Sequence, residues 1–475
     1  MSRSDASRPI QDPNANDGGF NSMPDAEGEG RRVYIETYGC QMNLADSELM
    51  GGILEDTGFA SADSLEEADV ILVNTCAVRE NAEDRVFGRL SQLLQYKHDD
   101  PDVVLGVTGC MAENLREKIF EQAPYVDLVV GPDAYRRLPQ LIASAVRENA
   151  DPVIDVKLDT DEVYEEFSPR RQDGVGAWVT IQRGCDKFCT FCIVPFTRGR
   201  ERGVPPDEVL RQCRELGEAG YKQVTLLGQT VNSYRYEETD FADLLREIAG
   251  VPGIERIRFT SPYPVDFSPK LIDTIGEYDE VCSYVHLPVQ SGSNRLLDRM
   301  RRGYTVEEYR DLVERMRRTI PDLALSTDVI VGFPGETEED FQKTVDLMED
   351  LRFDFAYMFE YSEREKTYAA RELEDDVPDE VKNERLQTII ELQESISREI
   401  FEQRVGTIQE VLVEGESKRD SGELSGRTDD FKTTVFPRPA DGSVEPGDLV
   451  DVAVDDCTSH TLLGELVDRA PAAAE

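Results

Sequence analysis

The sequence contains no apolar run of about 18 residues, so a helix that spans a membrane is not expected. Residues 1–20 also lack an apolar stretch, which argues against a secretory signal and predicts a cytoplasmic protein. In such a protein, nine cysteines favour metal binding or catalysis over disulfides. The 475 residues, 39% of them hydrophobic, are enough for several domains with buried cores.

Lysine is scarce, since only 11 of the 52 basic residues are lysines, and 97 acidic residues bring the formal net charge to −45. A surface of this charge repels polyanions at low salt. A surface adapted to high salt explains the same excess, because screening at about 1 M salt shortens the repulsion to about 3 Å. Any nucleic-acid-binding face must therefore be a local basic patch.

A fourth ligand is missing from the cysteine loop Cys185–Cys192, in which Cys185, Cys189 and Cys192 have the spacing C-x3-C-x2-C. Three thiolates can hold three irons of a cubane iron–sulfur cluster and leave the fourth iron open for a reactant. The alternative is a zinc knuckle or a disulfide loop. Structural zinc takes four ligands, and no further Cys or His lies nearby in the sequence. The spacing therefore favours an iron–sulfur cluster.

Three other cysteines each end an apolar run, at 32–40, 69–76 and 102–110. Helical patterns at 46–56 and 81–96 fill the gaps, so a parallel sheet covered on both faces is predicted. Ligands of such sheets gather at the carboxyl ends of the strands, where Cys40, Cys76 and Cys110 all fall. We therefore predict a second iron–sulfur cluster held by these three residues. The alternative is three unrelated buried cysteines.

The central part of the chain alternates strand and helix patterns. The strand patterns lie at 177–182, 223–227, 256–260, 283–287, 324–331 and 355–361, and the helical ones at 207–219, 240–249, 306–319 and 337–351. This order predicts an α/β fold, an open and partial (βα)6 TIM-like barrel with its site at the carboxyl ends of the strands. The cysteine loop follows the first strand at that end.

The C-terminal part begins with a periodic helix at 378–403. Five short strand patterns follow at 408–414, 424–428, 433–436, 449–454 and 462–467, which predict a small all-β, OB-like barrel. Five basic residues within it predict an RNA-binding face: Lys418, Arg419, Arg427, Lys432 and Arg438.

Several of these motifs resemble one family. The C-x3-C-x2-C loop with Phe191 is similar to the radical S-adenosylmethionine (SAM) signature, and the segments 37–48 and 74–83 resemble the methylthiotransferases. Gln41-Met42-Asn43 and Arg79-Glu80 match the branch that acts on isopentenylated adenosine in tRNA rather than the ribosomal-protein branch. The segments 411–415 and 424–428 resemble the TRAM domain, an RNA-binding module. The similarity runs from about residue 32 to 468.

The resemblance implies two [4Fe–4S] clusters and SAM as cofactors. SAM would bind the open iron of the cluster at Cys185, Cys189 and Cys192, and its reductive cleavage would give a radical that removes hydrogen from C2 of the base. The resemblance assigns SAM contacts to Phe191, Gln229, Asn232, Gln290, Ile330 and Gly332. Thr230 stands where the family usually has Asn. For the segment 332–335, a plain turn before a helix capped near Glu336 and Thr337 is an alternative.

Other side chains carry weaker signals. His286 is expected to pack or to position substrate, since radical chemistry needs no such base, and no catalytic residue is assigned. Cys213, Cys282 and Cys457 have no partner at ligand spacing. Six arginines that follow the cysteine loop or the Gln290 segment are candidates to guide the tRNA backbone: Arg198, Arg200, Arg202, Arg299, Arg301 and Arg302.

These patterns predict a disordered tail (1–30), a methylthiotransferase domain (31–147), an acidic linker (148–176), a radical SAM core with its closing helix (177–403), a TRAM domain (404–468) and a tail (469–475). The resemblance implies methylthiolation of C2 of N6-(dimethylallyl)adenosine at position 37, in the anticodon loop of tRNA. It further implies a monomer served by a reducing protein, such as a flavodoxin or ferredoxin, and by a sulfur donor. The alternatives are the same chemistry on another tRNA adenosine or on a ribosomal-protein aspartate, and a non-enzymatic RNA-binding scaffold.

Overall fold

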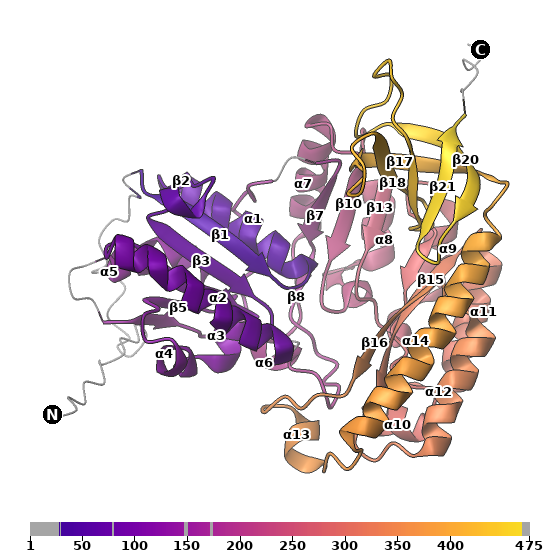
Figure 1. The fold of residues 1–475 in the computed structure, drawn as a ribbon, viewed down its shortest axis with the longest axis horizontal. Helices are drawn as coiled ribbons and strands as arrows, with labels where there is room; N and C mark the ends of the chain where they lie inside the picture. The colour runs from indigo at the N-terminus through magenta and orange to yellow at the C-terminus, as the bar shows by residue number, and fades with distance from the viewer. Residues whose placement is uncertain (1–27, 29, 78–79, 147–150, 172–173, 468–475) are drawn as a thin grey trace. The chain divides into compact units, whose positions relative to one another are not determined.

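The computed structural model describes residues 28, 30–77, 80–146, 151–171 and 174–467, except for the side chains of residues 80–82. The predicted tails therefore lie outside the described residues, apart from residues 28 and 30. The chain divides into two compact units, shown in Figure 1. The first comprises Met1–Gln172, Arg183–Asp186 and Cys192–Arg202, and the second comprises Asp173–Gln182, Lys187–Phe191 and Gly203–Glu475. Among the described residues, no helix combines the length and the apolar composition that crossing a membrane requires.

The first unit is built on a parallel sheet with the strand order β2-β1-β3-β4-β5-β6. Its elements are β1 (Arg32–Tyr38), α1 (Gln41–Asp56), β2 (Ala60–Ser61), β3 (Val70–Thr75), α2 (Glu80–Asp99), β4 (Val104–Gly109), α3 (Cys110–Leu115), α4 (Lys118–Gln122), β5 (Leu128–Val130), α5 (Leu138–Ala145) and β6 (Val153–Asp155). The short α6 (Val194–Thr197) also belongs to this unit. The predicted parallel sheet is confirmed.

Continuous apolar runs form the central strands because both faces of the sheet are covered. Every residue of β3 and β4 is buried. One face packs on α1 and α5, with Met50 and Leu141 in the core, and the other packs on α2 and α3, with Leu90 and Met111. Helices cover both sides of the indigo and purple sheet in Figure 1. Only the ends of these strands are therefore available for chemistry.

The segment predicted as a linker contributes to this domain. Residues 153–155 form β6, which pairs in parallel with β5, and all three are buried. Tyr164 lies in the same core cluster as Tyr135 and donates its hydroxyl hydrogen bond to Pro132 O at 2.8 Å. A three-residue strand in an acidic sequence gives almost no periodic signal, which is why the sequence did not reveal it.

The second unit contains the predicted open barrel. Its parallel strands follow the order β7-β10-β13 in one sheet and β14-β15-β16 in another, and the parallel bridge between Ile257 and Val281 joins the two. The strands are β7 (Gly176–Thr180), β10 (Gln223–Leu227), β13 (Arg256–Phe259), β14 (Tyr284–His286), β15 (Ala324–Val331) and β16 (Phe355–Glu360). The main helices are α7 (Pro206–Glu218), α8 (Phe241–Ala249), α9 (Pro269–Glu277), α10 (Asn294–Arg299), α11 (Val306–Thr319) and α12 (Glu338–Leu351).

Short elements complete this part of the chain. They are β8 (Gln182–Arg183), β9 (Arg202–Gly203), β11 (Arg235–Tyr236), β12 (Thr239–Asp240) and α13 (Tyr368–Glu372). The closing helix α14 (Asp379–Glu402) follows, as the sequence predicted. It packs on β16 through the contact of Phe401 with Phe355.

The C-terminal strands form a closed barrel in the order β17-β18-β19-β21-β20. They are β17 (Ile408–Glu416), β18 (Glu423–Thr428), β19 (Thr433–Pro437), β20 (Leu449–Cys457) and β21 (Thr461–Leu466), drawn in yellow shades in Figure 1. Arg258 donates hydrogen bonds to Thr428 O and Asp429 O at 2.8 and 2.9 Å, and Tyr284 stacks on Phe431. Because Tyr284 begins β14, this barrel is docked at the amino ends of the central strands.

Candidate functional site

Three cysteines of the first unit lie at one edge of its sheet. Cys40 follows β1, Cys76 follows β3 and Cys110 follows β4, and these three strands are neighbours. The backbone N–H of Cys76 donates to Tyr38 O at 3.0 Å, which aligns the ends of β1 and β3. The structure thus brings Cys40, Cys76 and Cys110 to the carboxyl ends of adjacent strands. We call them the N-terminal triad.

The charges around the N-terminal triad favour a thiolate at one member. The pKa of Cys40 is lowered to about 6, chiefly by a hydrogen bond with the Cys76 thiol; burial opposes this shift, and the positive charge of Arg198 adds to it. Burial raises the pKa of Cys110, while Arg198 opposes that rise. The Nε of Arg198 donates to Cys110 Sγ at 3.0 Å. Metal ligation requires deprotonated thiols, so these contacts suit a metal-binding triad.

Two buried asparagines link the segments that carry Cys40 and Cys76. Asn43 donates through Nδ2 to Asn74 Oδ1 at 3.0 Å and to Thr75 O at 3.2 Å. Asn74 donates in return to Asn43 O at 2.8 Å and to Ser47 Oγ at 2.9 Å. These bonds fix the start of α1 against the end of β3, and so Cys40 against Cys76. Sequence reasoning named both asparagines only as parts of a resemblance; their positions next to the cysteines were the available signal.

A buried carboxylate joins two of the arginines that flank the cysteine loop. Asp46 is fully buried and forms ion pairs with Arg183 Nη2 at 3.0 Å and Arg198 Nη1 at 2.6 Å. Arg183 also lies over the ring of Tyr164 at 4.8 Å. The expectation that Arg198 guides the tRNA backbone is therefore wrong, because its charge is buried and paired within the protein.

The other predicted tRNA-guiding arginines that have contacts in the structure are partly buried and partly exposed. Arg202 is buried and forms an ion pair with Asp133, and Arg200 pairs with Asp186 at 2.5 Å. Arg302 is buried against the cysteine loop and donates to Cys189 Sγ at 3.2 Å. Arg301 is exposed, with its guanidinium over the Tyr368 ring at 4.1 Å. A sequence reveals a basic residue but not the acid or thiol that it contacts.

The cysteine loop begins with a tight approach of two backbone segments. Gly184 has φ of 78°, and a Cβ there would lie 1.9 Å from Arg200 O. The N–H of Cys185 donates to Gly199 O at 3.1 Å.

No group of three or more His, Cys, Asp or Glu side chains in the described part of the chain is close enough to hold one metal ion. A cubane cluster binds each thiolate through a different iron, so it does not need its ligands to meet at one ion.

Two of the predicted SAM contacts follow β10, and they differ in what they already bind. Asn232 accepts from the N–H of Tyr263 at 2.7 Å and donates to Tyr263 O at 2.9 Å, so its amide holds the loop after β13. The Oε1 of Gln229 is buried and has no hydrogen-bond partner among the described residues. A buried acceptor without a donor is costly unless a ligand supplies one. Gln229 is therefore the stronger ligand-binding candidate of the two.

The remaining predicted SAM contacts surround the ends of β14 and β15. Gln290 is buried with φ of 75°, and its backbone bridges to Val329. Gly332 has φ of 69°, and its N–H donates to Glu336 Oε2 at 2.6 Å. Ile330 and Phe191 both pack on a core cluster with Phe333 at its centre. Gln290 and Gly332 follow β14 and β15, at the carboxyl end of the barrel strands.

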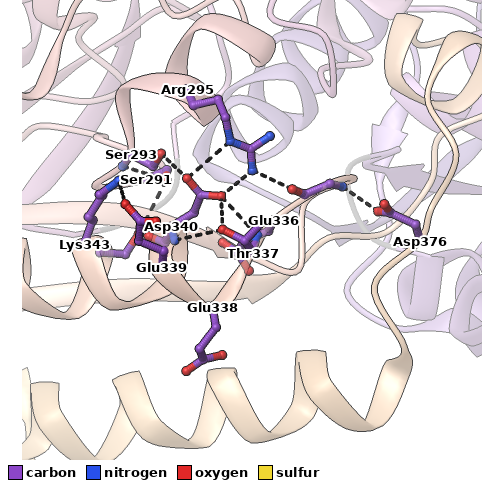
Figure 2. A network of polar contacts seen from close by, with 12 residues as sticks. Ser291, Ser293, Arg295, Glu336, Thr337, Glu338, Glu339, Asp340, Lys343 and Asp376 are labelled. Atoms are coloured by element: carbon purple, nitrogen blue, oxygen red, sulfur yellow. Dashed lines mark hydrogen bonds and ion pairs between the residues drawn. The ribbon is translucent and has the colours of Figure 1, made fainter.

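A polar network fixes the loop between β15 and α12, as Figure 2 shows. Asp340 accepts from Ser293 Oγ and Thr337 Oγ1, each at 2.6 Å, and forms an ion pair with Arg295. Arg295 also donates to Gly335 O at 2.6 Å. Burial raises the pKa of Asp340, but these hydrogen bonds outweigh burial and lower it well below its usual value. Thr337 is the N-cap of α12, so the predicted turn before a capped helix is present.

The C-terminal barrel presents less basic surface than its composition predicted. Lys432 is fully buried and pairs with Asp354 at 2.8 Å and Asp430 at 2.7 Å. Arg427 pairs with Glu414, and Arg438 pairs with Glu416. The exposed Lys418 and Arg419 lie in the turn between β17 and β18. The predicted five-residue RNA face is therefore wrong for Lys432.

His286 and the three remaining cysteines lie outside the N-terminal triad and the cysteine loop. His286 Nδ1 lies 2.8 Å from Ser326 Oγ, and Nε2 lies 3.4 Å from Asp328 Oδ1. Cys213 and Cys282 are buried, and Cys457 is half-buried. The predicted specificity residue Arg79 lies outside the described residues, as does the side chain of Glu80.

Comparison with protein families divides the chain into three matched segments. Residues 32–131 match the "Uncharacterized protein family UPF0004", residues 179–348 match the radical SAM superfamily, and residues 402–467 match the TRAM domain. Among solved structures, the radical SAM methyltransferase TsrM from Kitasatospora setae, with cobalamin and a [4Fe–4S] cluster bound, has a TM-score of 0.56. It is 16% identical, and the match covers 80% of each chain, so this similarity concerns the fold.

Curated relatives match the chain over nearly its whole length. A protein from Chloroherpeton thalassium is 48% identical over 91% of this chain and 95% of its own length. A protein from Porphyromonas gingivalis is 46% identical over 92% of this chain and 95% of its own length. Both are named tRNA-2-methylthio-N(6)-dimethylallyladenosine synthase. The chain therefore belongs to this family of radical SAM enzymes.

Proposed function

We propose that this chain is a tRNA methylthiotransferase. It converts N6-(dimethylallyl)adenosine at position 37 of tRNA into the 2-methylthio derivative, the reaction for which its relatives are named. The family uses SAM and a [4Fe–4S] cluster as cofactors. The observation that carries the proposal is the N-terminal triad on three adjacent strands, in the same chain as a C-x3-C-x2-C loop.

The donor sets suit two clusters. Cys185, Cys189 and Cys192 would hold the family's cluster, and Cys40, Cys76 and Cys110 would hold a second one. Each set offers three thiols, which ligate three irons and leave one open. The low pKa of Cys40 and the Arg198 contact to Cys110 favour the thiolate forms that ligation needs. When bound, the first cluster and SAM supply radical chemistry, and the second cluster holds sulfur for transfer.

The barrel residues would bind and orient SAM. The unpaired Oε1 of Gln229 would accept a hydrogen bond from the bound cofactor. Gly332, whose missing Cβ leaves room for the Lys382 side chain and whose N–H is bonded to Glu336, would act by shaping the end of β15. Phe191, Gln290 and Ile330 would line the same end of the barrel. Asn232 would act by holding the Tyr263 loop rather than by direct contact. Fixing a reactant in this way lowers the entropic part of the barrier.

The proposed reaction requires a tRNA substrate, a reductant and a sulfur donor. The target base is unpaired in the anticodon loop, where proteins read splayed bases by stacking and edge contacts. A low-potential protein such as a flavodoxin or ferredoxin would supply electrons, and a separate donor would restore the sulfur. We propose a monomer with domain limits of 31–147, 177–403 and 404–468. The segment 148–176 would join the first two, with its strand β6 serving the first.

Iron and sulfide counting tests the two-cluster arrangement. The wild type, Cys185→Ala and Cys40→Ala are reconstituted anaerobically and compared. Each substitution should remove about half of the iron, because each triad holds its own cluster. Loss of all the iron or of none would contradict two separate sites. Ser459→Ala, at a half-buried position between β20 and β21, provides a control that should keep the full iron content.

Mass analysis of tRNA nucleosides tests the substrate. Expression of the chain in cells that lack 2-methylthio adenosines should produce that modification on dimethylallylated tRNA, and Cys40→Ala should not produce it. A methylthio group found on a ribosomal-protein aspartate, with tRNA unchanged, would overturn the proposed substrate. Absence of SAM cleavage on reduction would instead support an RNA-binding scaffold.

A further inference from the structure

Arg302 is a buried cation beside a predicted cluster ligand. The residue is only 5% exposed, and its Nη1 lies 3.2 Å from Cys189 Sγ. Its Nη2 donates to Pro288 O at 3.0 Å, and its Nε donates to Tyr304 Oη at 3.1 Å. The guanidinium also lies over the rings of Tyr263 and Tyr304, at 4.7 and 5.5 Å from their centroids. Its position is therefore fixed on several sides.

The charge of Arg302 has no carboxylate to balance it. Among the described residues, no ion pair joins Arg302 to an aspartate or glutamate, and its polar partners are a carbonyl, a phenol and the Cys189 sulfur. A buried charge without a counter-charge is expensive. Arg198, which is also buried beside a cysteine, differs because it has a carboxylate partner, Asp46, which it shares with Arg183. The anion that Arg302 lacks is the one that a thiolate of a bound cluster would provide.

The backbone holds this contact in place. Thr190, next to Cys189, donates through its N–H to Met300 O and through Oγ1 to Arg299 O, each at 3.1 Å. These two bonds tie the Cys189–Thr190 part of the loop to the segment 299–302. Because Arg302 Nη1 also points at Cys189, the contact does not depend on a flexible surface side chain.

We propose that Arg302 is the resident counter-charge of the cluster held by Cys185, Cys189 and Cys192, and that it raises the reduction potential of that cluster. This inference rests on the proposed function, which places a cluster there. A cation beside a cluster ligand stabilises the reduced form, which carries one more negative charge, and a hydrogen bond to the sulfur acts in the same direction. Arg302 acts through Cys189, so it is a positioning residue rather than a catalytic one.

A redox titration of one cluster tests this. The full chain with Cys40→Ala, Cys76→Ala and Cys110→Ala carries only the loop cluster, whose presence is checked by iron counting at about four irons. Arg302→Gln and Arg302→Lys are made in this background, and the midpoint potential is followed by absorbance and electron paramagnetic resonance. Arg301→Gln is the matched control, because Arg301 is the exposed neighbour of the same residue type.

Arg302→Gln should move the potential to a more negative value, Arg302→Lys should move it less, and Arg301→Gln should leave it unchanged. An unchanged potential in Arg302→Gln with full iron content would overturn the inference. If Arg302→Gln loses its iron and Arg302→Lys keeps it, the need for the charge is shown directly. If both lose iron while Arg301→Gln keeps it, Arg302 serves packing only and the inference is wrong. Absence of iron in the background chain itself would contradict the proposed cluster.

Discussion

At the residue scale, several arginines of this acidic chain are buried and pair with buried carboxylates. Arg183 and Arg198 share Asp46, and Arg202 pairs with Asp133, all inside the first unit. Each pair satisfies a charge that would otherwise be stranded away from water. These contacts surround the ends of the cysteine loop, so they connect folding with the geometry of the site.

Asp46→Asn should therefore destabilise the protein strongly. The substitution leaves Arg183 and Arg198 buried without their carboxylate, and loss of one partner of a buried ion pair typically costs about 3–5 kcal/mol of unfolding free energy. Denaturant unfolding of the iron-free protein measures the change. Asp56→Asn, at the exposed end of the same helix, should change the free energy by less than about 0.5 kcal/mol. Equal effects of the two substitutions would contradict the role given to Asp46.

The lowered pKa of Asp340 predicts that the unfolding free energy depends on pH. Its folded-state pKa lies below the unfolded value of 3.8, so its carboxylate contributes stability above that pH and loses the contribution as the pH falls. Asp340→Asn should cost about 2 kcal/mol near pH 7, since hydrogen bonds to a charged group are lost. The difference from wild type should shrink below about pH 4. Unfolding of both proteins from pH 3 to 7 tests this, with the exposed Asp346→Asn as the control. A difference that does not vary with pH would contradict the assignment.

At the element scale, the turn between β4 and α3 sets the position of Cys110. Gly109 has φ of 90°, and a Cβ there would lie 2.4 Å from Asn74 Oδ1 and 2.6 Å from Thr75 O. A side chain at this position must therefore push apart the ends of β3 and β4, which carry Cys76 and Cys110. The glycine is required by the convergence of the N-terminal triad.

If the N-terminal triad holds the proposed second cluster, Gly109→Ala should lower the iron bound there. In a chain with Cys185→Ala, Cys189→Ala and Cys192→Ala, iron counting should fall well below the parent, and the strained backbone should cost about 1–3 kcal/mol. Gly88→Ala is the matched control, since its Cβ meets nothing within 4 Å in the middle of α2. That change should leave the iron unaffected and raise stability by about 0.5–1 kcal/mol. If Gly109→Ala kept its full iron content, the turn would tolerate the displacement, and the role given to Gly109 would be contradicted.

Long elements were predictable from the sequence because their periodicity is repeated many times. The patterns at 324–331 and 306–319 coincide with β15 and α11. Short strands such as β2 and β6 were not predictable, since two or three residues carry no period. The placement of Cys40, Cys76 and Cys110 at the ends of adjacent strands followed from the apolar runs that precede them. The partners of Arg198 and Arg302 did not, because ion pairs and sulfur contacts between distant residues leave no local pattern.

At the scale of the whole molecule, a net charge of −45 opposes any polyanionic partner. Within the C-terminal barrel, Lys432 is buried, and Arg427 and Arg438 have acidic partners. This leaves Lys418 and Arg419, both exposed in the β17–β18 turn, as the part of the predicted RNA face that has no acidic partner among the described residues. Attraction of tRNA to this barrel should therefore depend on few residues, and the slope of its binding constant against salt should be shallow, because that slope grows with the number of phosphates neutralised.

The double substitution Lys418→Ala and Arg419→Ala should weaken tRNA binding at every sequence tested. If each residue neutralises one phosphate of a duplex stem, the slope of log K against log salt should become shallower by about 1.8. Binding isotherms at several KCl concentrations measure the slope. Arg318→Ala with Lys343→Ala removes the same two charges from exposed positions on α11 and α12, where each already has an acidic partner, and should leave the slope unchanged. An equal loss in both double variants would mean that net charge, rather than a face on the C-terminal barrel, governs the encounter with tRNA.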